Sequence, residues 1–152
     1  MLIAGGADHD SPYARGLLDQ ASDSIIFAGI LPHDVLKVLY GHCALFVLPS
    51  YHEGLPIAAL EAASCSAPMV LSDIPANRDI GLDEASYFPA GAISRLAQMV
   101  EGPFDAFVGD VARVRRRFDW DRSAMETAIV YRGVMSRAAP PLLDAVKPGV
   151  SD

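Results

Sequence analysis

Two features are scarce in this sequence of 152 residues: cysteine and long apolar runs. The two cysteines, Cys43 and Cys65, stand in apolar surroundings without the spacing of a metal site, which favours reduced core thiols over a disulfide between them. No apolar run approaches the ~20 residues of a membrane span, and the N-terminus lacks the charged and apolar regions of a signal peptide. These absences predict a cytoplasmic protein without a membrane span.

Positive charge is also scarce. The chain has 12 lysine and arginine residues against 19 aspartate and glutamate residues, a net charge of −7 and an isoelectric point near 4.9. This balance argues against a general surface for nucleic acid or anionic membranes, so an anionic ligand has to be captured locally. The hydrophobic content of 51% and the charged content of 20% are those of an ordinary folded protein of one domain.

No metal site is expected near the N-terminus. Asp8, His9 and Asp10 are residue types that bind metals, but three adjacent residues in one loop seldom converge on one ion. We interpret them as a solvated loop. Gly5 and Gly6 follow a strand-like run without a clear helix signature after them, so a plain turn is favoured over a phosphate loop.

The stretch from Pro49 to Ser72, PSYHEGLPIAALEAASCSAPMVLS, carries the strongest pattern. It follows the apolar run Ala44 to Leu48, which is typical of a central parallel strand covered on both faces. The stretch itself ends in a second apolar run, Met69 to Ser72. We therefore predict a strand, a tight turn, a helix, a turn and a strand.

The predicted tight turn is suited to an anion. Gly54 lets the backbone approach a ligand closely or take a positive φ, and Pro56 fits the first position of a helix. The amides of Gly54, Leu55 and Ile57 are then expected to point outward at the positive end of the helix dipole. Such an arrangement favours phosphate.

Two glutamates flank this turn. Glu53 stands at the carboxyl end of the preceding strand, where open α/β sheets bind ligands. Glu61 lies five residues into the predicted helix, about 7.5 Å along the axis from its start at about 1.5 Å per residue. This distance matches the step from a pyrophosphate to its ribose. Glu61 shares a helical stripe with Ile57 and Ser64, so we expect a carboxylate that faces the interior and needs a partner such as ribose hydroxyls.

The block from Phe46 to Asp73 resembles the donor-binding half of retaining, two-domain (GT-B fold) glycosyltransferases. This large family includes sucrose synthases, glycogen synthases and many bacterial lipopolysaccharide and capsule hexosyltransferases. The resemblance implies an α/β fold with a Rossmann-like parallel sheet of about five strands and helices on both faces, half of a GT-B architecture. The residues that carry it are Pro49, Ser50, Glu53, Gly54, Pro56, Glu61, Ala62, Pro68, Val70, Ser72 and Asp73.

The resemblance also implies roles for single residues. Glu53 would bond a hydroxyl of the donor sugar and stabilise the transition state, and the amides of Gly54 and Leu55 would hold the diphosphate. Glu61 would take the ribose hydroxyls, and backbone groups near Ile30 and Leu31 would contact the base. The implied substrate is a UDP-, GDP- or ADP-sugar, with no further cofactor and no metal.

Two positions depart from the family pattern. Ser66 stands where the family commonly has glycine, and Asp79 stands where it usually has glutamate. Neither change touches the groups proposed to bind the ligand.

The resemblance runs from Leu2 to about Met135, so we expect a partial nucleotide-sugar-binding domain over residues 1–136 and a loose tail over 137–152. The N-terminal acceptor domain and the first βα unit of the family are not recognised in the sequence. The chain is therefore expected to be a truncated donor domain that binds nucleotide but does not transfer sugar alone. The complete enzyme would be cytoplasmic or peripheral to the inner membrane.

Two other functions remain open from the sequence. The first is a non-catalytic module for nucleotide-sugar binding or assembly that kept the fold. The second is a nucleotide-sugar epimerase of similar fold, although the PSYHEGLP context favours a transferase. A nicotinamide-binding domain is disfavoured because no complete glycine fingerprint follows a strand.

Overall fold

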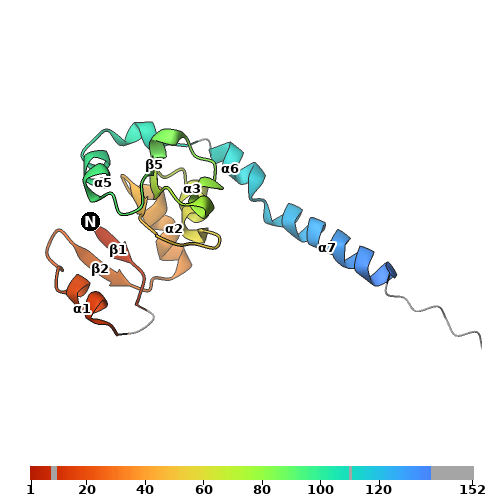
Figure 1. The fold of residues 1–152 in the computed structure, drawn as a ribbon, viewed down its shortest axis with the longest axis horizontal. Helices are drawn as coiled ribbons and strands as arrows, with labels where there is room; N and C mark the ends of the chain where they lie inside the picture. The colour runs from red at the N-terminus through yellow and green to blue at the C-terminus, as the bar shows by residue number, and fades with distance from the viewer. Residues whose placement is uncertain (8–9, 110, 138–152) are drawn as a thin grey trace, which may run out of the picture. The chain divides into compact units, whose positions relative to one another are not determined.

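A computed structural model describes residues 1–7, 10–109 and 111–137 of the protein (Figure 1). The chain divides into two compact units, Met1–Arg115 and Arg116–Asp152. Asp8 and His9 lie outside the described residues. So does the tail expected over 137–152, apart from Arg137, the last residue of a helix.

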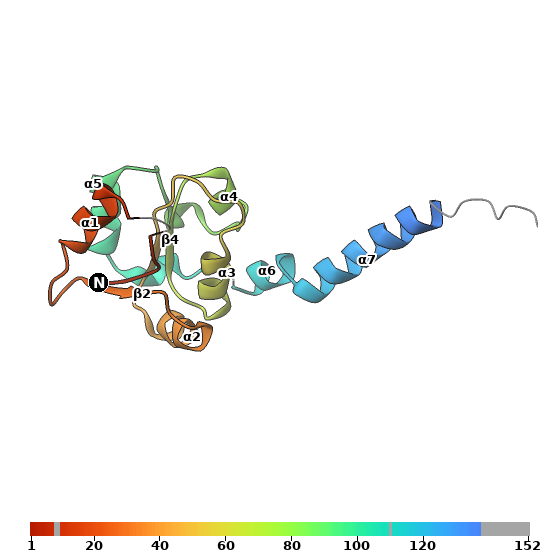
Figure 2. The same ribbon diagram turned by 90° about the horizontal axis from the view of Figure 1, so that it is seen from below.

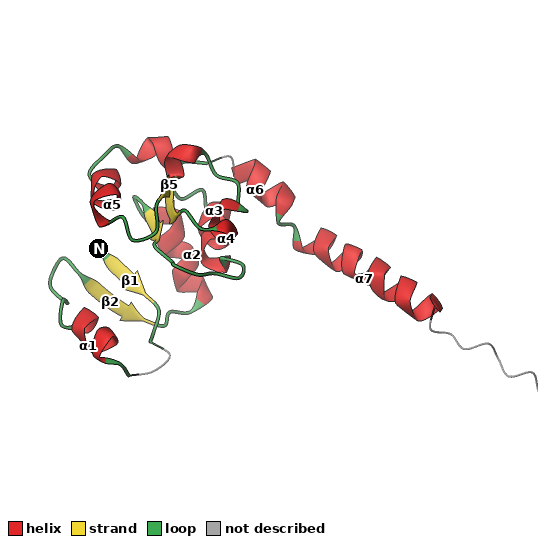
Figure 3. Ribbon diagram, viewed as in Figure 1, coloured by secondary structure: helices red, strands yellow, loops and turns green. Residues whose placement is uncertain are grey.

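The first unit contains five parallel strands in two sheets (Figure 3). The smaller sheet pairs β1 with β2, and Leu2 lies opposite Ile26. The larger sheet has the order β3-β4-β5, in which Val47 pairs with Val70 and Leu71 with Tyr87. The strands are β1 Leu2–Ala4, β2 Ile26–Gly29, β3 Phe46–Leu48, β4 Met69–Ser72 and β5 Tyr87–Phe88.

Helices alternate with these strands along the chain. Those of the first unit are α1 Pro12–Leu18, α2 His33–His42, α3 Ile57–Ser64, α4 Pro75–Arg78 and α5 Ile93–Val100, with 3₁₀ turns at Glu84–Ser86 and Phe104–Phe107. Helix α6, Val111–Arg117, spans the boundary between the units. The second unit contains α7, Trp120–Arg137.

The predicted α/β class with parallel strands is confirmed, but the sheet is smaller than expected. Five strands form, yet within the described residues no ladder joins β1 or β2 to the three-stranded sheet. Apolar runs mark strands because burial selects their side chains. The pairing of strands instead depends on which other strand lies alongside, and the side chains of a strand give little information about its partner.

The core lies between the larger sheet and its helices. All four residues of β4 are buried, as expected of a central strand with both faces covered. Helix α3 packs through Ala59, Ala62 and Ala63, which are at most 1% exposed, and these small side chains allow a close approach of its backbone. A buried cluster joins β4 and β5 to the later helices through Val70, Phe88, Met99 and Phe107.

Helix α3 ends in a Schellman motif at Ser66. The Ser66 amide donates to the Ala63 carbonyl at 3.0 Å, and the Ala67 amide donates to the Ala62 carbonyl at 3.1 Å. Ser66 has a φ of 62°, the only positive φ of a non-glycine residue among those described. Ser66 thus stands where the family commonly has glycine, and its side chain strains the backbone because the left-handed conformation disfavours a Cβ atom.

Arg78 ties α4 to the segments on either side of it. Its guanidinium donates to Asp73 at 2.6 Å and to both carboxylate oxygens of Glu84, and it lies 4.3 Å from the ring centroid of Tyr87. Hydrogen bonds from Arg78 hold the pKa values of Asp73 and Glu84 below their usual range. Asp73 and Glu84 are exposed and Arg78 is half-buried, so salt screens these pairs.

Replacing Ser66 with glycine is expected to stabilise the protein by about 0.5–1 kcal/mol, because glycine removes the left-handed strain at some cost in unfolded-state entropy. Urea unfolding of wild type and Ser66→Gly measures the difference. Ser64→Gly, in the last turn of α3, is the matched control and should destabilise by about 0.5–1 kcal/mol. An unchanged or lower stability of Ser66→Gly would contradict this account of the motif.

Stability should fall as the pH drops below about 5, because the unfolded chain then binds protons that the lowered pKa values of Asp73 and Glu84 resist in the folded state. Arg78→Met should flatten this decrease. Urea midpoints between pH 7 and pH 3 test it, with Arg95→Met, an exposed arginine of α5, as the control. Equal slopes for wild type and Arg78→Met would show that these pairs do not carry the pH dependence.

Candidate functional site

The carboxyl end of β3 leads directly to Glu53. The Ser50 hydroxyl donates to Glu53 Oε1 at 2.7 Å, and both residues are half-buried. The Ser50 carbonyl in turn accepts a hydrogen bond from the Ser72 hydroxyl at the end of β4. The carboxylate of Glu53 is therefore oriented by the ends of two adjacent strands.

Asn77 supports this arrangement from the core. Its amide nitrogen donates to the Ser72 carbonyl at 2.9 Å and to the Ser72 hydroxyl oxygen at 3.0 Å, and its side chain is fully buried. Asn77 donates to both oxygens of Ser72, so the Ser72 hydroxyl is free to donate its own proton to the Ser50 carbonyl. The segment after β4 thus fixes the segment after β3.

The start of α3 differs from the prediction at Pro56. Pro56 is the N-cap rather than the first helical residue, with φ −75° and ψ 77°. These angles are those of an inverse γ-turn, which the Ile57 amide closes by donating to the Leu55 carbonyl at 2.8 Å. The Ile57 amide therefore donates within the chain instead of pointing outward as expected.

Other amides at this turn have no such partner. Within the described part of the chain, no group accepts a hydrogen bond from the amide of Gly54, Leu55 or Ala58. Gly54 does not have a positive φ, and a Cβ atom there would meet nothing within 4 Å. Neither the backbone nor a neighbouring side chain requires glycine here, so Gly54 leaves open space in front of free donors at a helix N-terminus.

Glu61, the fifth residue of α3, is contacted by two side chains of α2. The Tyr40 hydroxyl donates to Glu61 Oε2 at 3.3 Å, and His33 Nδ1 lies 3.3 Å from Glu61 Oε1. Figure 2 shows the two helices beside each other. Ile57 and Ser64 of the same stripe are exposed, so the stripe does not face the core, but the Glu61 side chain is 32% exposed and therefore half-buried.

Tyr40 is a stable donor. Its ring packs edge-on against Phe46 of β3, with ring centroids 5.6 Å apart. Burial, followed by the charge of Glu61 and the hydrogen bond to it, raises the pKa of Tyr40 to about 12. The phenol therefore keeps its proton at neutral pH and donates to the carboxylate.

The loop after β2 presents its backbone. Ile30 is 86% exposed, and its side chain lies over Gly6, where an added Cβ would come within 3.3 Å of it. The Gly5 amide donates to the Gly29 carbonyl at 2.8 Å. The backbone groups of Ile30 and Leu31 make no hydrogen bond within the described ranges.

These groups form one candidate site at the carboxyl ends of β2 and β3. Chain continuity places Leu31 two residues before His33, which contacts Glu61, and Glu61 lies on the helix that begins beside Gly54. Sequence reasoning gave neither His33 nor Tyr40 a role at the site. Their spacing of seven residues, two helical turns, was the available signal.

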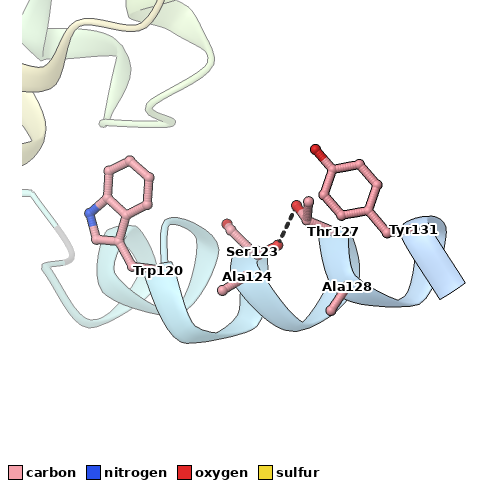
Figure 4. Close-up of a pocket in the computed structure, with 6 residues that line it drawn as sticks. All are labelled: Trp120, Ser123, Ala124, Thr127, Ala128 and Tyr131. Atoms are coloured by element: carbon pink, nitrogen blue, oxygen red, sulfur yellow. Dashed lines mark hydrogen bonds between the residues drawn. The ribbon is translucent and has the colours of Figure 1, made fainter.

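Helix α7 has a separate apolar pocket along one face, shown in Figure 4. Its lining contains no carboxylate and neither of the glutamates considered above, so it is not the candidate site. The residues that line it are Trp120, Ser123, Ala124, Thr127, Ala128 and Tyr131.

Two searches of the described residues bear on the class of protein. They contain no group of three or more histidine, cysteine, aspartate or glutamate side chains placed to hold a metal ion. None of their helices is both long enough and apolar enough to cross a membrane.

Known proteins resemble this chain over part of their length. It is 37% identical over 70 residues to an alpha-galactosylglucosyldiacylglycerol synthase of Streptococcus pneumoniae, which covers 46% of this chain and 19% of that protein. It is 30% identical over 122 residues to a D-inositol 3-phosphate glycosyltransferase of Streptomyces bingchenggensis, covering 75% of this chain and 27% of that protein. The chain thus spans less than a third of either relative.

A solved structure and a family description agree with these relatives. Sucrose-phosphate synthase from Thermosynechococcus elongatus superposes with a TM-score of 0.77 at 25% identity, over 90% of this chain and 39% of that one. The family described as glycosyl transferases group 1 matches residues 1–105, more than half of the 152. The protein therefore belongs to the group 1 glycosyl transferases and has their GT-B type of α/β fold.

Proposed function

We propose that this chain is the donor-binding part of a retaining glycosyltransferase that transfers a hexose from a nucleotide-diphospho-sugar. The observation that carries the proposal is the placement of Glu53 and Glu61 on either side of free amides at the start of α3. A phosphate is stabilised by such amides and by the positive end of the helix dipole. The two carboxylates accept hydroxyl hydrogen bonds, which nucleotide sugars supply on both sides of their diphosphate.

The donor would lie along the ends of β2 and β3. The free backbone groups of Ile30 and Leu31 suit a base, and Glu61 suits the ribose. The amides of Gly54 and Leu55 suit the diphosphate, and Glu61 lies about 6 Å along α3 from its first residue, Ile57, at about 1.5 Å per residue. Pro56 and Ile57 shape this turn through the hydrogen bond of the Ile57 amide.

The chemistry proposed for the site is electrostatic. As the bond between sugar and diphosphate breaks, negative charge grows on the departing diphosphate, and the fixed amides stabilise it without reorganising. Glu53, oriented by Ser50, would accept a hydroxyl of the sugar and stabilise the positive charge that develops there. The name of the Streptococcus pneumoniae relative describes an α-linked product. Formation of such a product from an α-linked donor sugar retains the configuration at the anomeric carbon.

Transfer itself would require an acceptor-binding domain. The chain spans 39% of the sucrose-phosphate synthase structure, and the residues discussed above are all assigned to the donor. We propose a glycan or a lipid-linked acceptor, bound by that second domain, and no transfer by residues 1–152 alone. One relative is named for a diacylglycerol product, and this name supports a lipid acceptor at the surface of a membrane.

Nucleotide binding is the first test. A thermal-shift panel of UDP, GDP, ADP and their sugar conjugates should identify one nucleotide that stabilises the chain by about 2.7 kcal/mol at about 100 times its Kd. For a chain of this size, that is a shift of roughly 5–10 °C. Glu61→Ala should lose most of the shift, whereas Glu101→Ala, an exposed residue that follows α5, should keep it. Equal shifts in both variants would contradict the role of Glu61.

The role of Glu53 is tested in the complete transferase. Glu53→Ala should reduce transfer by about 10²–10³-fold, because the developing charge loses a preorganised partner. Nucleoside diphosphate affinity should stay within about twofold, because the contact is made to the sugar. Steady-state transfer and equilibrium binding of the free diphosphate separate the two effects. A parallel loss of both would refute this division of labour between the glutamates.

A further inference from the structure

Both carboxylate oxygens of Glu61 have a side-chain neighbour. Tyr40 donates its hydroxyl to Oε2, and the His33 ring nitrogen Nδ1 approaches Oε1, each over 3.3 Å. Both partners belong to α2, whereas Glu61 belongs to α3. The carboxylate is thus fixed by a neighbouring helix rather than by its own.

The spacing within α2 explains why both partners reach the same carboxylate. His33 is the first residue of the helix and Tyr40 the eighth, so they stand two turns apart on one face. The Tyr40 ring is half-buried and anchored by Phe46. The His33 side chain is 89% exposed, so it contacts Glu61 from the solvent side.

The remaining acceptor capacity of Glu61 matches a diol. An ionised carboxylate offers about four lone-pair sites on two oxygens. Tyr40 occupies one site on Oε2, and the His33 ring lies beside Oε1, with Nδ1 3.3 Å from it. At least one site on each oxygen is left, and the side chain is 32% exposed, so two neighbouring hydroxyl groups can approach together.

We propose that His33 is a positioning residue for sugar-diol recognition. Together with Tyr40 it clamps the Glu61 carboxylate in the orientation that receives the two hydroxyls of a ribose. This inference rests on the proposed function, since it assumes that Glu61 meets the ribose of a nucleotide. It adds that His33 acts through Glu61, without a contact of its own to the ribose.

The experiment compares a nucleotide with its analogue that lacks both ribose hydroxyls. The nucleoside diphosphate selected by the thermal-shift panel and its 2′,3′-dideoxy form are titrated into wild type, His33→Ala and His33→Asn. Asparagine places a donor nitrogen close to the position of Nδ1, so it is the conservative variant. His42→Ala is the matched control, because its ring contacts the Val38 carbonyl at 2.8 Å at the other end of the same helix.

His33→Ala should bind the ribonucleotide about fivefold more weakly, an effect of the size of one exposed ion pair. His33→Asn should recover most of this affinity, and His42→Ala should match wild type. Binding of the dideoxy analogue should be the same in all four proteins, because the clamp acts only through the hydroxyls. Since His33 is exposed, urea midpoints of its variants should stay near that of wild type.

Three results would overturn the inference: no loss in His33→Ala, an equal loss for the dideoxy analogue, or no recovery in His33→Asn. Glu61→Ala separates this failure from that of the proposed function. If Glu61→Ala loses the preference for the ribonucleotide and His33→Ala does not, the clamp is wrong and the ribose contact stands. If Glu61→Ala keeps that preference, or no nucleotide binds, the proposed function fails and the clamp fails with it.

Discussion

The hydrogen bond from Ser72 to the carbonyl of Ser50 joins the ends of β4 and β3, and the candidate site depends on this junction. β4 is buried along its whole length, so its end is fixed by the core. Asn77 donates hydrogen bonds to both oxygens of Ser72, and the Ser72 hydroxyl donates its proton to the Ser50 carbonyl. The orientation of Glu53 follows, because its carboxylate is bound to the side chain of that same serine.

Glu61 is supported by a different mechanism. It lies on α3, whose alanine face packs closely on the sheet, so the helix itself cannot shift easily. Its carboxylate, however, is half-buried beside α2 and takes its orientation from that helix. One glutamate is thus positioned by strand ends and the other by a helix–helix contact. A substitution in either support should therefore leave the other glutamate in place.

Much of this site could be predicted from the sequence. The apolar runs located the strands, and the Gly-x-Pro turn between two glutamates located the start of α3, with an error of one residue at Pro56. These signals are local, because a few neighbouring residues decide a turn, a cap or a burial pattern. The position of Ser66, where the family commonly has glycine, has a left-handed backbone, which the sequence analysis did not predict.

The predictions that failed concern contacts between segments far apart in sequence. Tyr40 and Glu61 are separated by 21 residues, and the face that α2 turns toward α3 is set by packing rather than by the pattern of α2 itself. The split between the two sheets is of the same kind, since β1 and β2 read as strands whether or not another strand pairs with them. Helical spacing could suggest a pair such as His33 and Tyr40, but not the carboxylate that they share.

The net charge of −7 does not prevent such a chain from binding a diphosphate. At physiological ionic strength, interactions between exposed charges fade beyond about 8 Å, so distant carboxylates contribute little at the start of α3. Glu53 is the nearest acidic residue in sequence to the free amides, and its charge is partly satisfied by the Ser50 hydroxyl. The local field is therefore set by unpaired N–H groups and the helix dipole, which attract an anion over a short range. Binding by this arrangement needs no basic surface, and it favours a ligand that brings its own hydroxyls to the two glutamates over a bare anion.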